Sequence, residues 1–90
     1  MKYRARPVEV EAVRFTGDID KLSGFTHGAL YPVHEEDRGD NPEVIAEIVD
    51  VKYMTWKGVC VGDWIVKVPG GFRVFTDKEF RDGFELITNG

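Results

Sequence analysis

The chain has 90 residues, 42% of them hydrophobic, and carries a net charge of −4. This length is below the size at which chains usually divide into two cored units, so residues 1–90 are expected to form a single domain. The acidic balance argues against sequence-independent binding of nucleic acid, which requires basic groups to displace counterions from phosphates. No apolar run exceeds three residues. That pattern argues against a membrane span or a signal peptide and predicts a cytoplasmic location.

The first half of the chain begins with an alternating segment, PVEVEAVRF at residues 7–15, which is typical of a strand. Its phase changes at Ala12, which predicts either a bulge or a strand whose second half is covered on the other face. Asp18 has the position of a helix cap and Gly24 that of a left-handed helix end. Residues 29–31 precede Pro32 and predict a short edge strand, because proline cannot donate to a central ladder.

The middle of the chain is acidic and harder to interpret. Residues 34–43 (HEEDRGDNPE) are rich in turn formers and predict an exposed, mobile loop. Residues 43–50 fit either a helix, because Pro42 suits a helix start, or a strand, because β-branched residues predominate. We expect a strand, with a helix at most in the first turns.

The second half contains shorter, clearer signals. Thr55–Gly58 (TWKG) predicts a turn that leads into a strand at 59–61. Thr76 and Glu79 have the spacing of a capping box, so a short helix should follow and end at Gly83. The remaining expectations are a turn at 62–63, strands at 64–68 and 72–75 joined by a hairpin at 69–71, and a last strand at 84–87. The sum predicts an α+β domain with a mostly antiparallel sheet, or half-open barrel, of about six short strands and two short helices.

Motifs for metal, phosphate or thiol chemistry are absent from the sequence. His27 and His34 lack the spacing of a zinc site, and no glycine loop follows a strand and opens a helix. The single cysteine, Cys60, is flanked by valines and is interpreted as a packed residue. We therefore expect no metal, no cofactor and no enzymatic activity. One enzyme alternative stays open, in which carboxylates such as Asp63 and Asp77 act catalytically.

Charged and aromatic residues suggest a binding role instead. Trp56 is expected at a hairpin tip, where it is either an exposed anchor for a partner or folded back over the sheet. The charge is polarised between a basic N-terminal segment and the acidic middle. Such asymmetry can steer a protein partner or pair two copies in a homodimer, but we favour its commonest meaning, which is a solvated loop and a solvated strand face. The candidate partner-binding residues are Trp56, Arg14, Asp63, Lys67, Glu35, Glu36 and Asp37. An alternative is a small ligand bound in a dimer groove lined by Arg14, Lys67, Trp64 and Asp63.

Two segments, KYRARPVEVEAVRFTG at 2–17 and VCVGDWIVKVPGGFRVFTDKEFRDGFELI at 59–87, resemble a group of short, mostly uncharacterised proteins of tailed bacteriophages and prophages. In that group a PVxVEAVxF/W-T-G strand follows a lysine-tyrosine-arginine start, and a GD-aromatic-I-V/I-K segment precedes a glycine hairpin. The resemblance covers about half of the chain, and residues 25–50 depart from the pattern. The resemblance implies a phage accessory protein that works in the bacterial cytoplasm, and it supplies neither an activity nor a catalytic residue. The surplus of aromatic residues, the polarised charge and the absence of a catalytic motif lead us to expect that the domain binds a host or phage protein.

Overall fold

The computed structural model describes residues 2–5 and 8–86, with side chains described for residues 10–84. All the described strands belong to one eight-stranded sheet. Six strands have four residues or more and two are two-residue strands. The strands are β1 (Lys2–Ala5), β2 (Val8–Arg14), β3 (Tyr31–Pro32), β4 (Ala46–Asp50), β5 (Thr55–Val59), β6 (Trp64–Val68), β7 (Gly71–Phe75) and β8 (Glu85–Leu86).

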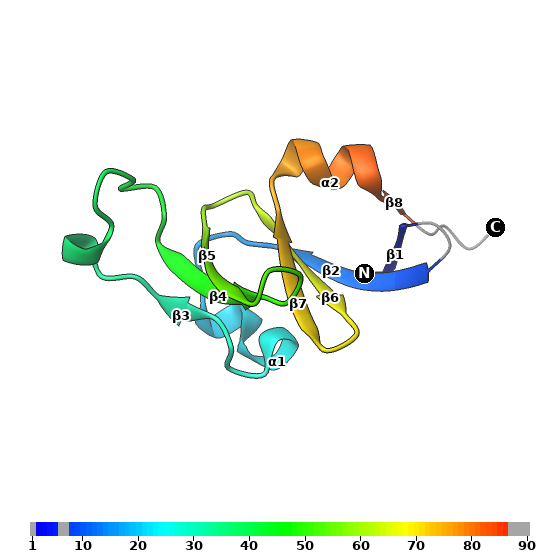
Figure 1. Ribbon diagram of the computed structural model, residues 1–90, viewed down its shortest axis with the longest axis horizontal. Coiled ribbons are helices and arrows are strands. Elements are labelled where there is room, and N and C mark those ends of the chain that lie inside the picture. The colour runs from blue at the N-terminus through cyan, green and yellow to red at the C-terminus, as the bar shows by residue number, and fades with distance from the viewer. Residues whose placement is uncertain (1, 6–7, 87–90) are drawn as a thin grey trace.

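Two short α-helices and two 3₁₀ turns complete the described part of the chain, and the predicted α+β class with a mostly antiparallel sheet is confirmed. The helices are α1 (Ser23–Thr26) and α2 (Asp77–Gly83), and the 3₁₀ turns are η1 (Asp20–Leu22) and η2 (Glu35–Asp37). Figure 1 shows α1 and α2 on opposite sides of the sheet. Within the described ranges, no helix is long and apolar enough to cross a bilayer.

The strand order is β3-β4-β7-β6-β2-β1-β8, and β5 pairs with β4 (Figure 1). All strand pairs are antiparallel except β4 with β7, which meet in parallel at Asp50 and Phe72. The prediction of a strand within residues 43–50 is therefore correct, and β4 is that strand. The edge strand expected at residues 29–31 lies instead at Tyr31–Pro32, and in the described part of the sheet this strand, β3, pairs only with β4.

Strand β2 explains why the alternation in its sequence changes phase at Ala12. Its pairing with β1 and β6 runs without a bulge, so the second alternative holds and both faces of the strand are covered. Val10 and Ala12 face one core, whereas Val13 and Phe15 face the other. Because successive side chains of a strand point to opposite faces, this switch needs no break in the backbone.

The two hydrophobic cores lie on opposite faces of the sheet. The buried residues of the first core, on the α1 side, are Phe15, Leu22, Leu30, Ala46, Ile48, Val59, Ile65, Phe72 and Val74. Those of the second core, on the α2 side, are Val10, Ala12, Trp64, Val66 and Phe80. The second core is smaller, and its two largest side chains are aromatic. The rings of Trp64 and Phe80 stack with their centroids 4.0 Å apart.

Helix α2 begins as the sequence predicts. The Thr76 side chain accepts a hydrogen bond from Glu79 N at 3.1 Å, and Glu79 Oε1 accepts one from Thr76 N at 2.8 Å. These two bonds form the predicted capping box, which satisfies backbone donors at the helix start. The bond from Thr76 N also lowers the pKa of the Glu79 carboxyl below its ordinary value.

Four local predictions are wrong. The left-handed residue that ends α1 is His27, with φ 53°, and Gly24 lies inside the helix.

Segment 55–58 is not a turn but part of β5, because the chain reverses at Val51–Met54, where Met54 N donates to Asp50 O at 2.8 Å. Consequently Trp56 lies within a strand rather than at a hairpin tip. The strand expected at 59–61 ends at Val59. Residues 34–43, by contrast, are exposed as predicted except for half-buried Arg38, and the acids Glu35–Asp37 form a 3₁₀ turn within this loop. Ile87, expected in the last strand, lies outside the described residues.

Asp50 fastens β4 to β7, although its side chain is fully buried. Its carboxylate accepts hydrogen bonds from Lys52 N at 3.0 Å and from Val74 N at 3.2 Å. Arg73 Nε lies 3.6 Å from Asp50 Oδ1, and the Arg73 guanidinium lies over the ring of Phe75. A buried charge is tolerated only when hydrogen-bond donors replace the water that it loses on burial. Because these donors belong to the turn after β4 and to β7, the Asp50 carboxylate fixes the position of β4 against β7.

Candidate binding surface

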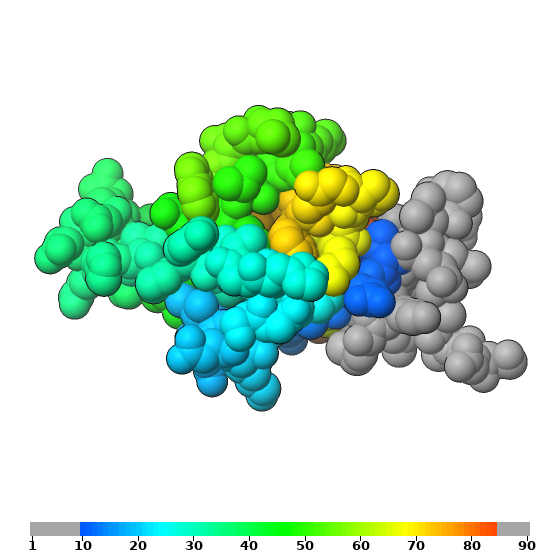
Figure 2. Space-filling view, turned by 90° about the horizontal axis from the view of Figure 1, so that it is seen from below, coloured from blue at the N-terminus to red at the C-terminus, as the bar shows by residue number. Residues whose placement is uncertain are grey.

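An apolar hollow opens beside β4, which we call the β4 notch. Its volume is about 340 Å³, and its lining is almost entirely hydrophobic. Figure 2 shows the surface hollowed between the segment before β3, the turn after β4 and the hairpin that joins β6 to β7. The lining residues are Ala29, Tyr31, Ile48, Val49, Val51, Met54, Trp56, Gly70, Gly71 and Phe72.

The notch arises because two different strands pair with one edge of β4 and leave a gap between them. On one edge β4 pairs with β5 over its whole length. On the other edge, β3 pairs with Ala46 and Glu47, and β7 pairs with Asp50. In this register Ile48 and Val49 have no partner on that second edge, so β3 and β7 leave a gap about two residues wide.

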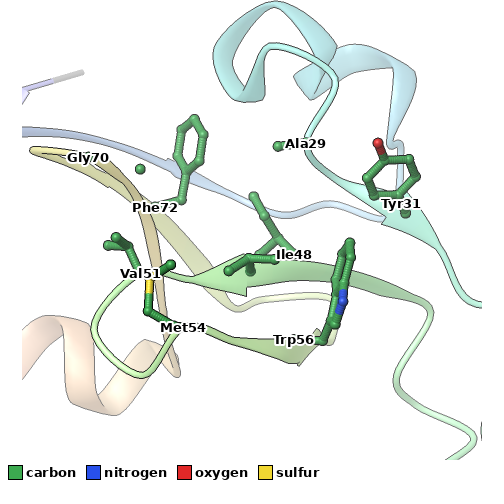
Figure 3. Close-up of a pocket in the computed structure, with 10 residues that line it drawn as sticks. Ala29, Tyr31, Ile48, Val51, Met54, Trp56, Gly70 and Phe72 are labelled. Atoms are coloured by element: carbon green, nitrogen blue, oxygen red, sulfur yellow. The ribbon is translucent and has the colours of Figure 1, made fainter.

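The β6–β7 hairpin can approach the notch closely because Gly71 has no side chain. A Cβ atom placed on Gly71 would lie 3.3 Å from Val51 Cβ, which is tighter than nearly all real contacts of this kind. The backbone of the hairpin therefore forms one wall directly, and Val51 packs against it. Figure 3 shows Val51 and Met54 at this end of the notch and Tyr31 and Trp56 at the other.

Tyr31 and Trp56 form an exposed aromatic pair. Trp56 on β5 lies opposite Val49 on β4, and Tyr31 on β3 lies opposite Glu47 on β4. All four side chains therefore share the outer face of the β3-β4-β5 part of the sheet. The two rings meet edge to face with centroids 5.7 Å apart. Tyr31 is 52% and Trp56 53% exposed, and Met54 at the opposite end of the notch is also exposed. Contiguous exposed apolar groups of this kind are typical of interaction sites.

Charged residues stand at both ends of the notch. At the end formed by the β4–β5 turn, exposed Lys52 follows Val51, and half-buried Lys67 lies opposite Phe72 with its Nζ over the ring of Phe25. At the other end, Glu47 lies opposite Tyr31. Beyond Glu47, on the far left of Figure 1, η2 presents the exposed acids Glu35, Glu36 and Asp37.

The structure does not bring the predicted ligand groove together within one chain. Arg14 and Trp64 lie opposite each other on neighbouring strands, on the α2 side of the sheet, with the guanidinium 6.0 Å from the indole centroid. Lys67 lies on the other face, because it is an odd number of residues from Trp64 on β6. Of the predicted partner-binding residues, Trp56 lines the notch, Lys67 lies beside it and the three acids lie beyond its β3 end.

Asp63 and Asp77, the candidate catalytic carboxylates, both make structural contacts. Asp63 Oδ2 accepts a hydrogen bond from Cys60 N at 2.9 Å, which organises the turn at Gly62. Asp77 accepts a hydrogen bond from Trp64 Nε1 at 3.0 Å and pairs with Arg81 at 2.9 Å. The hydrogen bond from Trp64, together with the charges of Arg14 and Arg81, lowers the pKa of the Asp77 carboxyl.

Cys60 lines a second, separate hollow with Glu43, Ile45 and Val61. Burial raises the pKa of its thiol, and the nearby carboxylates of Asp63 and Glu43 raise it further. A raised pKa disfavours the reactive thiolate. Among the residues that the structure describes, no cluster of three metal-ligating side chains occurs.

Sequence reasoning identified Trp56 but missed Tyr31, Val49, Val51 and Met54. The segment AEIVDV at residues 46–51 contained a signal of the exposed patch, because apolar residues occur on both faces of a strand with this sequence. Because Ala46 and Ile48 face the core, Val49 must face outward. An outward valine indicates an apolar outer face, and in the structure Val49 lies opposite the exposed Trp56.

Comparisons with known proteins identify no relative. No family model matches the chain, and no curated protein or solved structure is significantly similar to it.

Proposed function

We propose that this domain is a protein-binding module whose partner docks on the β4 notch. The observation that carries the proposal is the exposed Tyr31–Trp56 pair at the mouth of this apolar hollow beside β4. Aromatic side chains around a pocket are the usual centre of a protein interface. The resemblance to phage proteins suggests the setting, which is an accessory protein that acts on a host or phage protein in the bacterial cytoplasm.

The lining of the notch favours an apolar side chain over a polar metabolite. Sites for small molecules generally combine an apolar wall with a few convergent polar groups that fix orientation. In the β4 notch, Tyr31 is the only lining residue with a polar side-chain group apart from the indole N–H of Trp56. Such a lining can hold a leucine or phenylalanine side chain from another protein without leaving polar groups unsatisfied.

The contacts of Asp63 and Asp77 favour structural roles over catalysis. Asp63 holds a turn, and Asp77 links α2 to β6 through Trp64. Neither carboxylate lines the β4 notch. A binding function is therefore better supported than the enzyme alternative.

Site-specific photo-crosslinking in bacterial host cells tests this function. We expect p-benzoylphenylalanine in place of Trp56 to give a discrete crosslinked adduct after irradiation, because this position lies at the centre of the proposed interface. Adding Tyr31→Ala should reduce the adduct about tenfold or more, as loss of a central anchor commonly does.

The matched control is the same photoreactive residue in place of Val61. Val61 is 61% exposed and lines the other hollow, so it should give no such adduct. Absence of an adduct at position 56, or the same adduct at both positions, would reject the notch as the binding surface.

A further inference from the structure

We infer that the β4 notch, if it binds a protein as proposed above, takes one bulky apolar side chain from a short segment that carries acidic residues on one side of this anchor and basic residues on the other. The gap between β3 and β7 along β4 sets the size of the anchor. The charges at its two ends set the flanking residues.

The size of the gap admits a side chain and excludes a helix. Two unpaired residues on β4 correspond to roughly 7 Å, at about 3.3 Å per residue. A helix with its side chains is about 10–12 Å across, so the backbone of the partner stays outside and only a side chain enters. The open edge of β4 at Ile48 and Val49 and the wall at Phe72 then border that side chain.

The charged residues at the two ends of the notch predict the charges that flank the anchor in the partner. Lys52 and Lys67 lie at the turn end, and Glu47 followed by η2 lies at the β3 end. An acidic residue of the partner is therefore favoured at the turn end and a basic residue at the β3 end. Complementary rim charges mainly improve specificity and the rate of association.

A second copy of the chain is a poorer occupant. The described large apolar side chains that are exposed are Tyr31, Tyr53, Met54, Trp56 and Val61. Tyr31, Met54 and Trp56 belong to the notch itself, so a two-fold contact would set one hollow against another.

Four capped heptapeptides test the inference by titration of the tryptophan fluorescence of the full chain. They are EEGFGKK, EEGFGEE, KKGFGKK and the anchor-free EEGAGKK. The expected result is that EEGFGKK binds about threefold or more tighter than the two peptides of one charge sign, because each exposed ion pair contributes modestly. EEGAGKK should bind at least about tenfold more weakly, and Trp56→Phe should remove the fluorescence change.

Lys52→Glu should reverse the preference, so that KKGFGKK binds more tightly than EEGFGKK. Lys78→Glu, which makes the same charge change on exposed α2, should leave the order unchanged. Equal binding of all three phenylalanine peptides would overturn the charge inference and leave the notch as a binding site. If EEGAGKK binds as tightly as EEGFGKK, the anchor and the proposed function both fail. Sedimentation that shows a dimer with no peptide binding would assign the notch to a second copy.

Discussion

Replacing Asp50 with alanine is expected to lower the free energy of unfolding by about 3–5 kcal/mol, the usual cost of removing one partner of a buried pair. The substitution leaves Lys52 N and Val74 N without their acceptor. It also removes the carboxylate that faces the half-buried Arg73. Small domains have only about 5–15 kcal/mol of stability, so Asp50→Ala should unfold at a much lower urea concentration than the unchanged chain.

Asp82→Ala is the matched control for this loss. Asp82 is an exposed aspartate of α2 whose carboxylate pairs with Lys78, and its removal should not shift the urea midpoint measurably. If Asp50→Ala unfolds at the same urea concentration as Asp82→Ala, the link between β4 and β7 does not depend on the Asp50 carboxylate. The notch would then need another support for its β7 wall.

Trp64→Ala should lower the free energy of unfolding by about 3–5 kcal/mol, because truncation of a large buried ring leaves a cavity that its neighbours fill only in part. Trp64 is the largest buried side chain of the second core and stacks on Phe80. Its indole N–H also ties β6 to Asp77 at the first turn of α2. Loss of both contacts should release α2, which circular dichroism and urea unfolding can measure together.

Trp64→Phe separates the two contributions. Phenylalanine retains most of the ring contact with Phe80 but cannot donate to Asp77, so a smaller loss is expected than for alanine. The pKa of Asp77 should also rise toward its ordinary value, because the bond from Trp64 is the largest cause of its lowering. Equal losses for Trp64→Phe and Trp64→Ala would show that the hydrogen bond, rather than the ring, holds α2.

The elements with strong local signals could be predicted from the sequence. The alternation in β2, the glycine hairpin before β7 and the capping box at Thr76 depend on neighbouring residues, and all three are present. The wrong predictions lie where local signals compete. Gly24 satisfies the composition of a helix end, yet His27 takes the left-handed conformation. Gly58 suggested a turn, but it is the residue that lets Val44 pack against β5.

The candidate site could be predicted only in part, because it is made by pairings between distant segments. For Trp56 the sequence left open whether the ring is an exposed anchor or folds back over the sheet. Its partner Tyr31 lies on β3 and meets it only across β4. The notch also requires β7 to join β4 at Asp50 alone. No periodicity within either strand encodes that single parallel contact, which instead depends on the buried carboxylate of Asp50.

Amide chemical-shift mapping by NMR, with EEGFGKK added to the ¹⁵N-labelled chain, tests the central claim most directly. We predict that the shifts concentrate at Val49, Val51, Gly70 and Gly71, which surround the β4 notch, while the amides of α2 stay unchanged. Shifts confined to α2 and Arg14, or the absence of any shift at the notch amides, would contradict the proposal that the β4 notch is the binding surface.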